Sequence, residues 1–164
     1  MKRIWTGMAV ALTVLLVMAG PVKAASEPVS IRIVNTITAG GFHGRAVVTG
    51  AVKAACKDGP PVVTGTGEGF HVEDRLVCPG GTLFLSAEGT AVPHVDPVAC
   101  IVRVTQHGTF RITGGTGQYA GITASGTWTG EGRQILVRTA EGCALDQPPR
   151  VVVRTLKLIG TLNR

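Results

Sequence analysis

Residues 109–128 read TFRITGGTGQYAGITASGTW. A short strand is expected from Phe110 to Thr113, and a second alternating run ends at Trp128. The turn between them is dense in glycine, the residue that reaches positive φ and lets backbones approach closely at no steric cost. These residues therefore predict a sharp, close-packed corner between two β-strands. The glycines expected to be structural in this corner are Gly114, Gly115, Gly117 and Gly121.

Apolar residues alternate with polar ones along the rest of the chain, and turn residues interrupt them about every eight to twelve positions. No long amphipathic helix is expected after the N-terminal segment. Together with the two strands of the corner, these runs predict eight or nine antiparallel strands. The other runs are residues 29–33, 46–52, 62–72, 83–85, 101–105, 135–138 and 151–162.

An antiparallel sheet of this length tends to close or to fold on itself, because closure removes exposed strand edges. Repeated glycines and few aromatic residues suit a strongly curved sheet. We therefore expect an all-β, closed antiparallel barrel of eight or nine strands, with an open sandwich as the alternative. The interior of a barrel of about eight strands is either filled by side chains or holds one small ligand.

The N-terminal segment has the pattern of a secretory signal peptide. A basic start precedes the apolar run of residues 8–18, and small residues precede a cleavage site after Ala24 or Ala25. The apolar run is shorter than the about 20 residues that a membrane-spanning helix needs. The pattern predicts a signal peptide at residues 1–25, a single domain at residues 26–164 without a membrane span, and an extracellular location.

The formal charge of +6 overstates the basicity of the secreted chain, because Lys2, Arg3 and Lys23 belong to the predicted signal peptide. Thirteen basic and ten acidic residues remain, a net charge of +3. This charge is too small to indicate a nucleic-acid partner. The excess basic residues fall late in the sequence and are Arg133, Arg138, Arg150, Arg154, Lys157 and Arg164. We interpret them as solvated outer faces of strands, with a basic patch for an anionic partner as the alternative.

The four cysteines are Cys56, Cys78, Cys100 and Cys143. An even number in an exported chain predicts two disulfides, for which three pairings are possible. No two are closer than 22 residues and no histidine stands at ligand spacing, so no metal site is expected. Cys78 precedes a tight Pro-Gly-Gly turn and Cys100 opens a later strand. These two could face each other across adjacent strands, which would leave Cys56 for Cys143.

The GGTG turn, Tyr119 and the following Ala-Gly and small-residue strand resemble the hallmark segment of the allene oxide cyclase and dirigent-like β-barrel superfamily. The resemblance is closest to small secreted actinobacterial proteins of that type, which the segment LVCPGGTLFL at residues 76–85 also resembles. It implies their barrel fold and supports a Cys78–Cys100 pairing. Ala124 stands where many members carry glycine. No motif matches the catalytic residues of the enzymes, so the resemblance implies no activity.

Two pairs of residues are candidates for chemistry or binding. His71 and Glu73 alternate and so share one face of a strand, where a histidine–carboxylate pair can do acid–base work if both line a cavity. The alternative is a solvent-facing polar row. Tyr119 and Trp128 are candidates for a ligand pocket, since pockets use aromatic side chains. The alternative for these two is packing in the core or at the rim.

The favoured function is a non-catalytic module that binds a small apolar molecule or contacts an extracellular surface, without a cofactor. One alternative is a cyclase- or dirigent-type barrel enzyme that orients a reactive intermediate, for which shape and one or two polar groups suffice. Another is a secreted inhibitor or cell-envelope interaction protein that uses its rim loops. An interior cavity of at least about 300 Å³ with convergent polar groups favours the first two, and a packed interior favours the third.

Overall fold

The structure is a computed structural model that describes residues 26–67 and 69–163. Within these residues the chain forms eleven β-strands and one short 3₁₀ turn, which confirms the all-β prediction. The predicted signal peptide at residues 1–25 lies outside them. In chain order the elements are β1 (Ser26–Thr38), β2 (Gly41–Gly50), β3 (Ala54–Asp58), β4 (Val62–Thr66), β5 (Gly69–Cys78), β6 (Gly81–Asp96), β7 (Ile101–Gly115), η1 (Gly117–Tyr119), β8 (Thr123–Ile135), β9 (Val137–Thr139), β10 (Gly142–Ala144) and β11 (Val151–Asn163).

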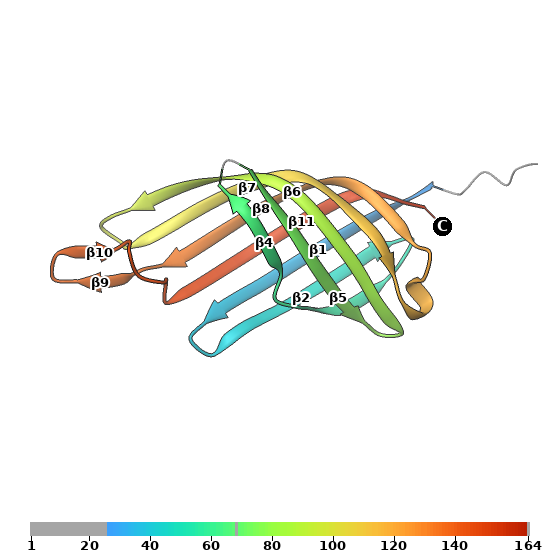
Figure 1. The fold of residues 1–164 in the computed structure, drawn as a ribbon, viewed down its shortest axis with the longest axis horizontal. Coiled ribbons are helices and arrows are strands. Elements are labelled where there is room, and N and C mark those ends of the chain that lie inside the picture. Colours follow the sequence, from blue (N-terminus) through green and yellow to red (C-terminus); the bar gives the residue numbers. More distant parts are fainter. Residues whose placement is uncertain (1–25, 68, 164) are drawn as a thin grey trace, which may run out of the picture.

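Eight of these strands form a ring of antiparallel neighbours (Figure 1). Going around the ring, the order is β3-β2-β1-β11-β8-β7-β6-β5. The ring closes where β3 pairs with β5, with Lys57 opposite Val77 and Asp58 opposite Leu76. β4 pairs with β5 beside this closure, and β9 pairs with β10 in a separate hairpin. The antiparallel sheet therefore rings through eight strands, as a barrel-like fold with β4 as an additional neighbour.

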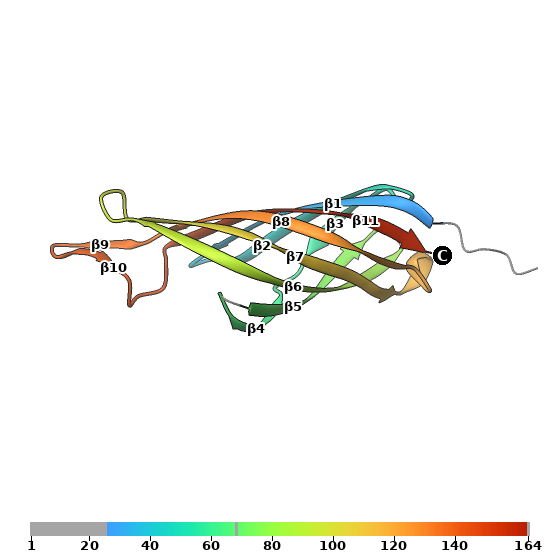
Figure 2. The same cartoon turned by 90° about the horizontal axis from the view of Figure 1, so that it is seen from above.

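The two ends of the ring differ in how they are filled. The β9–β10 hairpin projects from one end, and η1 lies at the opposite end (Figures 1 and 2). Strand alternation turns every second side chain inward, and near η1 these inward side chains pack into a fully buried core. The largest of them include Ile31, Leu83, Phe110, Ile112 and Leu162. Toward the β9–β10 hairpin, the inward side chains instead surround an open space.

The glycine-dense corner joins β7 to β8 through η1, as predicted. Gly114, Gly117 and Gly121 all have positive φ. Gly117 has a φ of 60° and lies so close to the neighbouring turn that a Cβ atom there would come within 2.1 Å of the Gly80 carbonyl oxygen. Tyr119 is buried in this corner, and its hydroxyl donates a hydrogen bond to the Pro79 carbonyl at 2.9 Å. The corner is thus tied to the β5–β6 turn by close backbone packing.

The predicted disulfide pairing, Cys78–Cys100 with Cys56–Cys143, is wrong. Cys56 is bonded to Cys78, with Cα atoms 4.2 Å apart, and Cys100 is bonded to Cys143, with Cα atoms 5.3 Å apart. Cys78 and Cys100 do not face each other, because β6 runs between them for 16 residues. At about 3.3 Å per residue, this strand alone spans roughly 50 Å. Cys56 reaches Cys78 because their strands are the two that close the ring.

We predict that replacing Gly117 by valine destabilises the fold by about 1–3 kcal/mol, because a β-branched residue is strained at positive φ. Thermal melts measure the effect. Ala120→Val is the matched control, since Ala120 lies in the same corner, is exposed and has a φ of −59°. Equal melting temperatures for the two variants would contradict this account of the corner.

We predict that the double substitution Cys56→Ala and Cys78→Ala lowers the free energy of unfolding by about 3 kcal/mol, the usual contribution of a disulfide that closes a loop of this size. It should also speed hydrogen exchange at the amides of β3, because the cross-link holds the ring closure. Replacing Cys100 and Cys143 in the same way is the control, and it should affect the β9–β10 hairpin. Unchanged protection of β3 in the first variant would contradict the role given to its disulfide.

Candidate functional site

A cavity of about 430 Å³ lies inside the ring, in the half nearer the β9–β10 hairpin. Its walls are inward side chains of β1, β5, β6, β7, β8 and β11, together with residues of β4 and the turn that follows it. Most of the wall is apolar, with Ile33, Val72, Leu85, Leu156 and Leu158 among its members. The structure therefore holds a mainly apolar chamber inside the ring.

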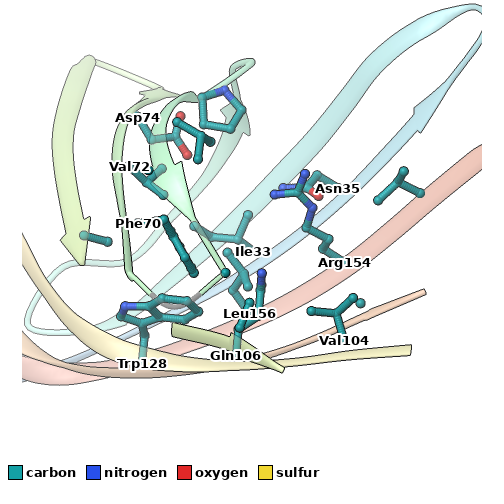
Figure 3. A pocket seen from close by; sticks show the side chains of 18 of the residues that line it. Ile33, Asn35, Phe70, Val72, Asp74, Val104, Gln106, Trp128, Arg154 and Leu156 are labelled. Atoms are coloured by element: carbon teal, nitrogen blue, oxygen red, sulfur yellow. The ribbon is translucent and has the colours of Figure 1, made fainter. Parts of the chain in front are cut away.

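Two aromatic side chains form one end of the chamber. Trp128 and Phe70 line it with their ring centroids 5.9 Å apart and their planes tilted by 59° (Figure 3). The indole nitrogen of Trp128 donates to the carbonyls of Glu88 and Thr109, both at 3.1 Å. Because its polar atom is bonded to the strands, the ring of Trp128 is fixed and presents carbon atoms to the cavity. Trp128 thus lines the cavity, and its part in binding a ligand stays a prediction.

Tyr119 does not reach this cavity. It is buried at the opposite end of the ring, where it borders a second hollow of about 480 Å³, more open than the first, together with Ala51, Val52 and Lys53. Its hydroxyl is bonded to the Pro79 carbonyl, and the Gln118 side chain donates to that hydroxyl at 2.8 Å. The structure therefore places Tyr119 in the packing of the corner, which was the alternative given for it.

The other end of the cavity is polar, and strand register explains its composition. Asn35 on β1 lies directly opposite Arg154 on β11, and both line the cavity. On the other side of Asn35, Gly44 on β2 separates it from Asp58 on β3. A Cβ atom at Gly44 would lie 2.5 Å from Oδ2 of Asp58. The missing side chain at Gly44 thus leaves the room in which Nδ2 of Asn35 donates to that oxygen at 3.3 Å.

Asp74 on β5 completes this polar end. Three of the polar residues are labelled in Figure 3: Arg154 extends toward Asn35, and Asp74 lies across the cavity from them. Asn35 and Asp58 are almost fully buried, with exposed fractions of 3% and 5%. Oδ1 of each has no hydrogen-bond partner among the described residues. Protonation lets Asp58 and Asp74 share a hydrogen bond, so Oδ1 of Asn35 is the buried polar atom here that lacks a partner among the described residues.

Burial dominates the protonation of Asp58. It raises the pKa of that carboxyl from 3.8 to about 8, with the hydrogen bond and charge of Asp74 acting in the same direction and Asn35 and Arg154 acting against it. Asp58 is therefore protonated at neutral pH, and the Asp58–Asp74 pair holds a proton. Burial also lowers the pKa of Arg154, and the charge that Asp58 carries when it is ionised opposes this shift. The guanidinium nevertheless stays charged, as arginine does in proteins.

His71 and Glu73 share one face of β5, as predicted, with Nε2 of His71 2.6 Å from Oε1 of Glu73. That face is the outer one, and the two side chains are 39% and 55% exposed. The inward residues of the same strand are Phe70, Val72 and Asp74, which line the cavity. The predicted acid–base pair therefore lies outside the chamber, and the carboxylate that reaches the chamber is the next residue, Asp74.

Sequence reasoning did not single out Asn35, Asp58 or Arg154 as site residues. The sequence does contain a pattern that could have identified Asn35. Asn35 continues the inward alternation of Ile31 and Ile33 and so puts a polar side chain at a core position. Arg154 was interpreted as part of an outer face, whereas it lines the cavity. Asp58 carries no such signal, since its place depends on the pairing of β3 with β5.

Within residues 26–67 and 69–163, no group of three or more His, Cys, Asp or Glu side chains could hold a metal ion. The same residues contain no helix that is long and apolar enough to cross a membrane. Comparison with protein-family models, with curated proteins and with solved structures gave no match. The site is therefore interpreted from its own geometry.

The raised pKa of Asp58 predicts a pH dependence of stability. Between pH 3.8 and about 8 the folded chain holds a proton on Asp58 that the unfolded chain releases. The contribution of Asp58 to stability is therefore complete below this window and is lost as the pH rises through it. We predict that Asp58→Asn removes this decline, so that the variant gains stability relative to the native chain as the pH is raised.

Urea unfolding at a series of pH values from about 4 to about 9 measures this difference. Asp146→Asn is the matched control, because Asp146 is an exposed loop residue and the substitution removes the same charge. It should leave the pH profile between these limits unchanged. Parallel profiles for the native chain and Asp58→Asn would contradict the assignment of a proton to Asp58.

Proposed function

We propose that this protein is a secreted, disulfide-stabilised β-barrel that binds one small, mainly apolar molecule inside the ring without transforming it. The observation that carries the proposal is the cavity of about 430 Å³, with an aromatic end at Trp128 and Phe70 and a polar end at Asn35 and Arg154. Ligand pockets are typically concave, mostly apolar and equipped with a few polar groups that orient the ligand. This cavity has all three properties.

Secretion is part of the proposal, and two features support it. Two disulfides indicate an oxidising environment, because thiols are kept reduced in the cytosol. The basic start, apolar run and small residues at positions 1–25 fit a signal peptide that would deliver the chain to such an environment.

We also propose that the chain is a barrel of the allene oxide cyclase and dirigent-like type. The support is the resemblance of residues 109–128, together with an antiparallel sheet that rings through eight strands around a cavity. A secreted inhibitor that acts through its rim loops is less well supported, because such a protein has no need of a hollow interior.

A second candidate function is an enzyme that orients a reactive intermediate. One observation favours it: Asp58, whose pKa is raised to about 8, and Asp74 form a carboxyl pair at the polar end of the cavity. Carboxyl groups with strongly raised pKa values can supply protons near neutral pH. Binding is the more economical proposal, because Asp58 itself is buried and only Asp74 lines the chamber.

Filling the cavity tests the binding function. We predict that N-phenyl-1-naphthylamine, a neutral apolar fluorophore, binds the native chain saturably at one site, and that Ala91→Phe weakens this binding at least about tenfold. Ala91 lines the cavity, so a phenyl ring there occupies the ligand's space. Fluorescence titration measures the affinity.

The control is Val92→Phe, which introduces the same ring one position along β6. Val92 is 61% exposed and is not part of the cavity wall, so this variant should bind as the native chain does. Equal affinities for the native chain and Ala91→Phe, or the absence of saturable binding to the native chain, would count against the proposed function.

A further inference from the structure

Arg154 is a cation whose hydrogen-bonding capacity is not used within the described part of the chain. Its guanidinium has five N–H donors, yet no carboxylate of residues 26–67 and 69–163 lies within the 4.0 Å that defines an ion pair with it. The nearby carboxyl groups are engaged elsewhere. Oδ2 of Asp58 accepts from Asn35, and Oδ1 of Asp74 accepts from the backbone nitrogen of Arg75 at 2.6 Å.

A second observation points to a missing partner at the same place. Asn35 lies opposite Arg154 in the β1–β11 register and lines the cavity. Its side chain is only 3% exposed, and its Oδ1 has no hydrogen-bond partner among the described residues. Leaving buried donors and acceptors unpaired is costly. Figure 3 shows the Arg154 side chain extending beside Asn35 at the edge of the chamber.

The rest of the chamber limits the shape of what could pair with Arg154. Arg154 lies opposite Gly132 of β8, four positions from Trp128 on the same strand. At about 3.3 Å per residue, the two levels are about 13 Å apart. Between these levels the wall carries the apolar side chain of Leu156 and the amide of Gln106, both opposite Gly130 of β8. A ligand that meets both ends therefore has a charged or strongly accepting group at one end and an apolar body at the other.

The volume of the cavity limits the size of the ligand. The cavity of about 430 Å³ corresponds to about 14 water molecules at about 30 Å³ each, which suits a molecule of one or two rings. Trp128 and Phe70 form a tilted aromatic pair at the far end. Aromatic rings prefer offset or tilted contact with other aromatic rings, so a flat ring system matches this wall better than a flexible chain does.

We propose that the cavity takes an aromatic monocarboxylate, with its carboxylate on the Arg154 guanidinium and its ring against Trp128 and Phe70. This inference rests on the proposed binding function and narrows its ligand class. The guanidinium fork donates two parallel hydrogen bonds to a carboxylate. Asp58 is protonated at neutral pH, and the carboxylate that lines the chamber, Asp74, lies across the cavity from Arg154. Arg154 is thus the residue that selects an anionic ligand over a neutral one of the same shape.

Isothermal titration calorimetry at pH 7 with 2-naphthoate and 2-naphthamide tests the selection. The two probes share the ring and differ in charge. We expect 2-naphthoate to bind the native chain at least about tenfold more tightly than 2-naphthamide. Arg154→Gln should reduce the affinity for 2-naphthoate to that for the amide and leave the amide nearly unchanged. Arg154→Lys keeps the charge but loses the two-pronged guanidinium, so its affinity for 2-naphthoate should lie between those of the native chain and Arg154→Gln.

Arg133→Gln is the matched control, because Arg133 lies on β8, is exposed and loses the same charge; it should bind 2-naphthoate as the native chain does. Equal affinity of the native chain for acid and amide overturns the inference, and this comparison needs no variant to fold. If octanoate binds as tightly as 2-naphthoate, the inference that the ligand is aromatic is overturned.

N-phenyl-1-naphthylamine, titrated into the same samples, distinguishes a failure of the carboxylate inference from a failure of the proposed binding function. Binding of this neutral probe without any preference for 2-naphthoate overturns the carboxylate inference and leaves the binding function standing. If none of the probes binds, both proposals are overturned.

Discussion

The pairing of β3 with β5 is the constraint on which the rest of this structure depends. Only two register pairs make it, Lys57 with Val77 and Asp58 with Leu76, yet they turn an open row of strands into a ring with an interior. The Cys56–Cys78 disulfide joins the same two strands. The closing strand also delivers Asp58 to the polar end of the cavity, beside Asp74 on β5. Closure of the sheet and assembly of the site are therefore one event in this fold.

The two ends of the ring have different roles: one holds the packed core and the other holds the cavity. Near η1, large apolar side chains fill the space completely and supply the hydrophobic stabilisation of the fold. Toward the β9–β10 hairpin, small residues such as Ala87, Ala91 and Gly132 line the wall and leave the chamber open. Burying Asn35 there opposes folding, since its Oδ1 has no partner among the described residues and unpaired buried polar atoms are destabilising. Such a cost is typical of a site that is kept for function.

Local patterns in the sequence carried the predictions that the structure confirms. The glycines of residues 114–121 specify the corner because positive φ is a property of single positions. Alternation predicted the all-β class, and Trp128, proposed because pockets use aromatic side chains, lines the cavity. The Cys56–Cys78 bond and the Asp58–Asp74 contact could not be obtained in this way, because both depend on the pairing of β3 with β5, which are not joined by a single turn. The length of β6, which keeps Cys78 from Cys100, was likewise hidden by Gly89 and Pro93 within it.

The central claim is that the space inside the ring is occupied by a ligand when the protein works. Native mass spectrometry of the chain isolated from the culture medium of its own source tests this most directly, because no ligand need be guessed in advance. The account predicts a folded species heavier than the disulfide-bonded chain by the mass of one small molecule, which is lost when the same sample is denatured. A folded species with the mass of the chain alone, whose cavity holds only ordered water in an experimental structure of that same sample, would contradict it.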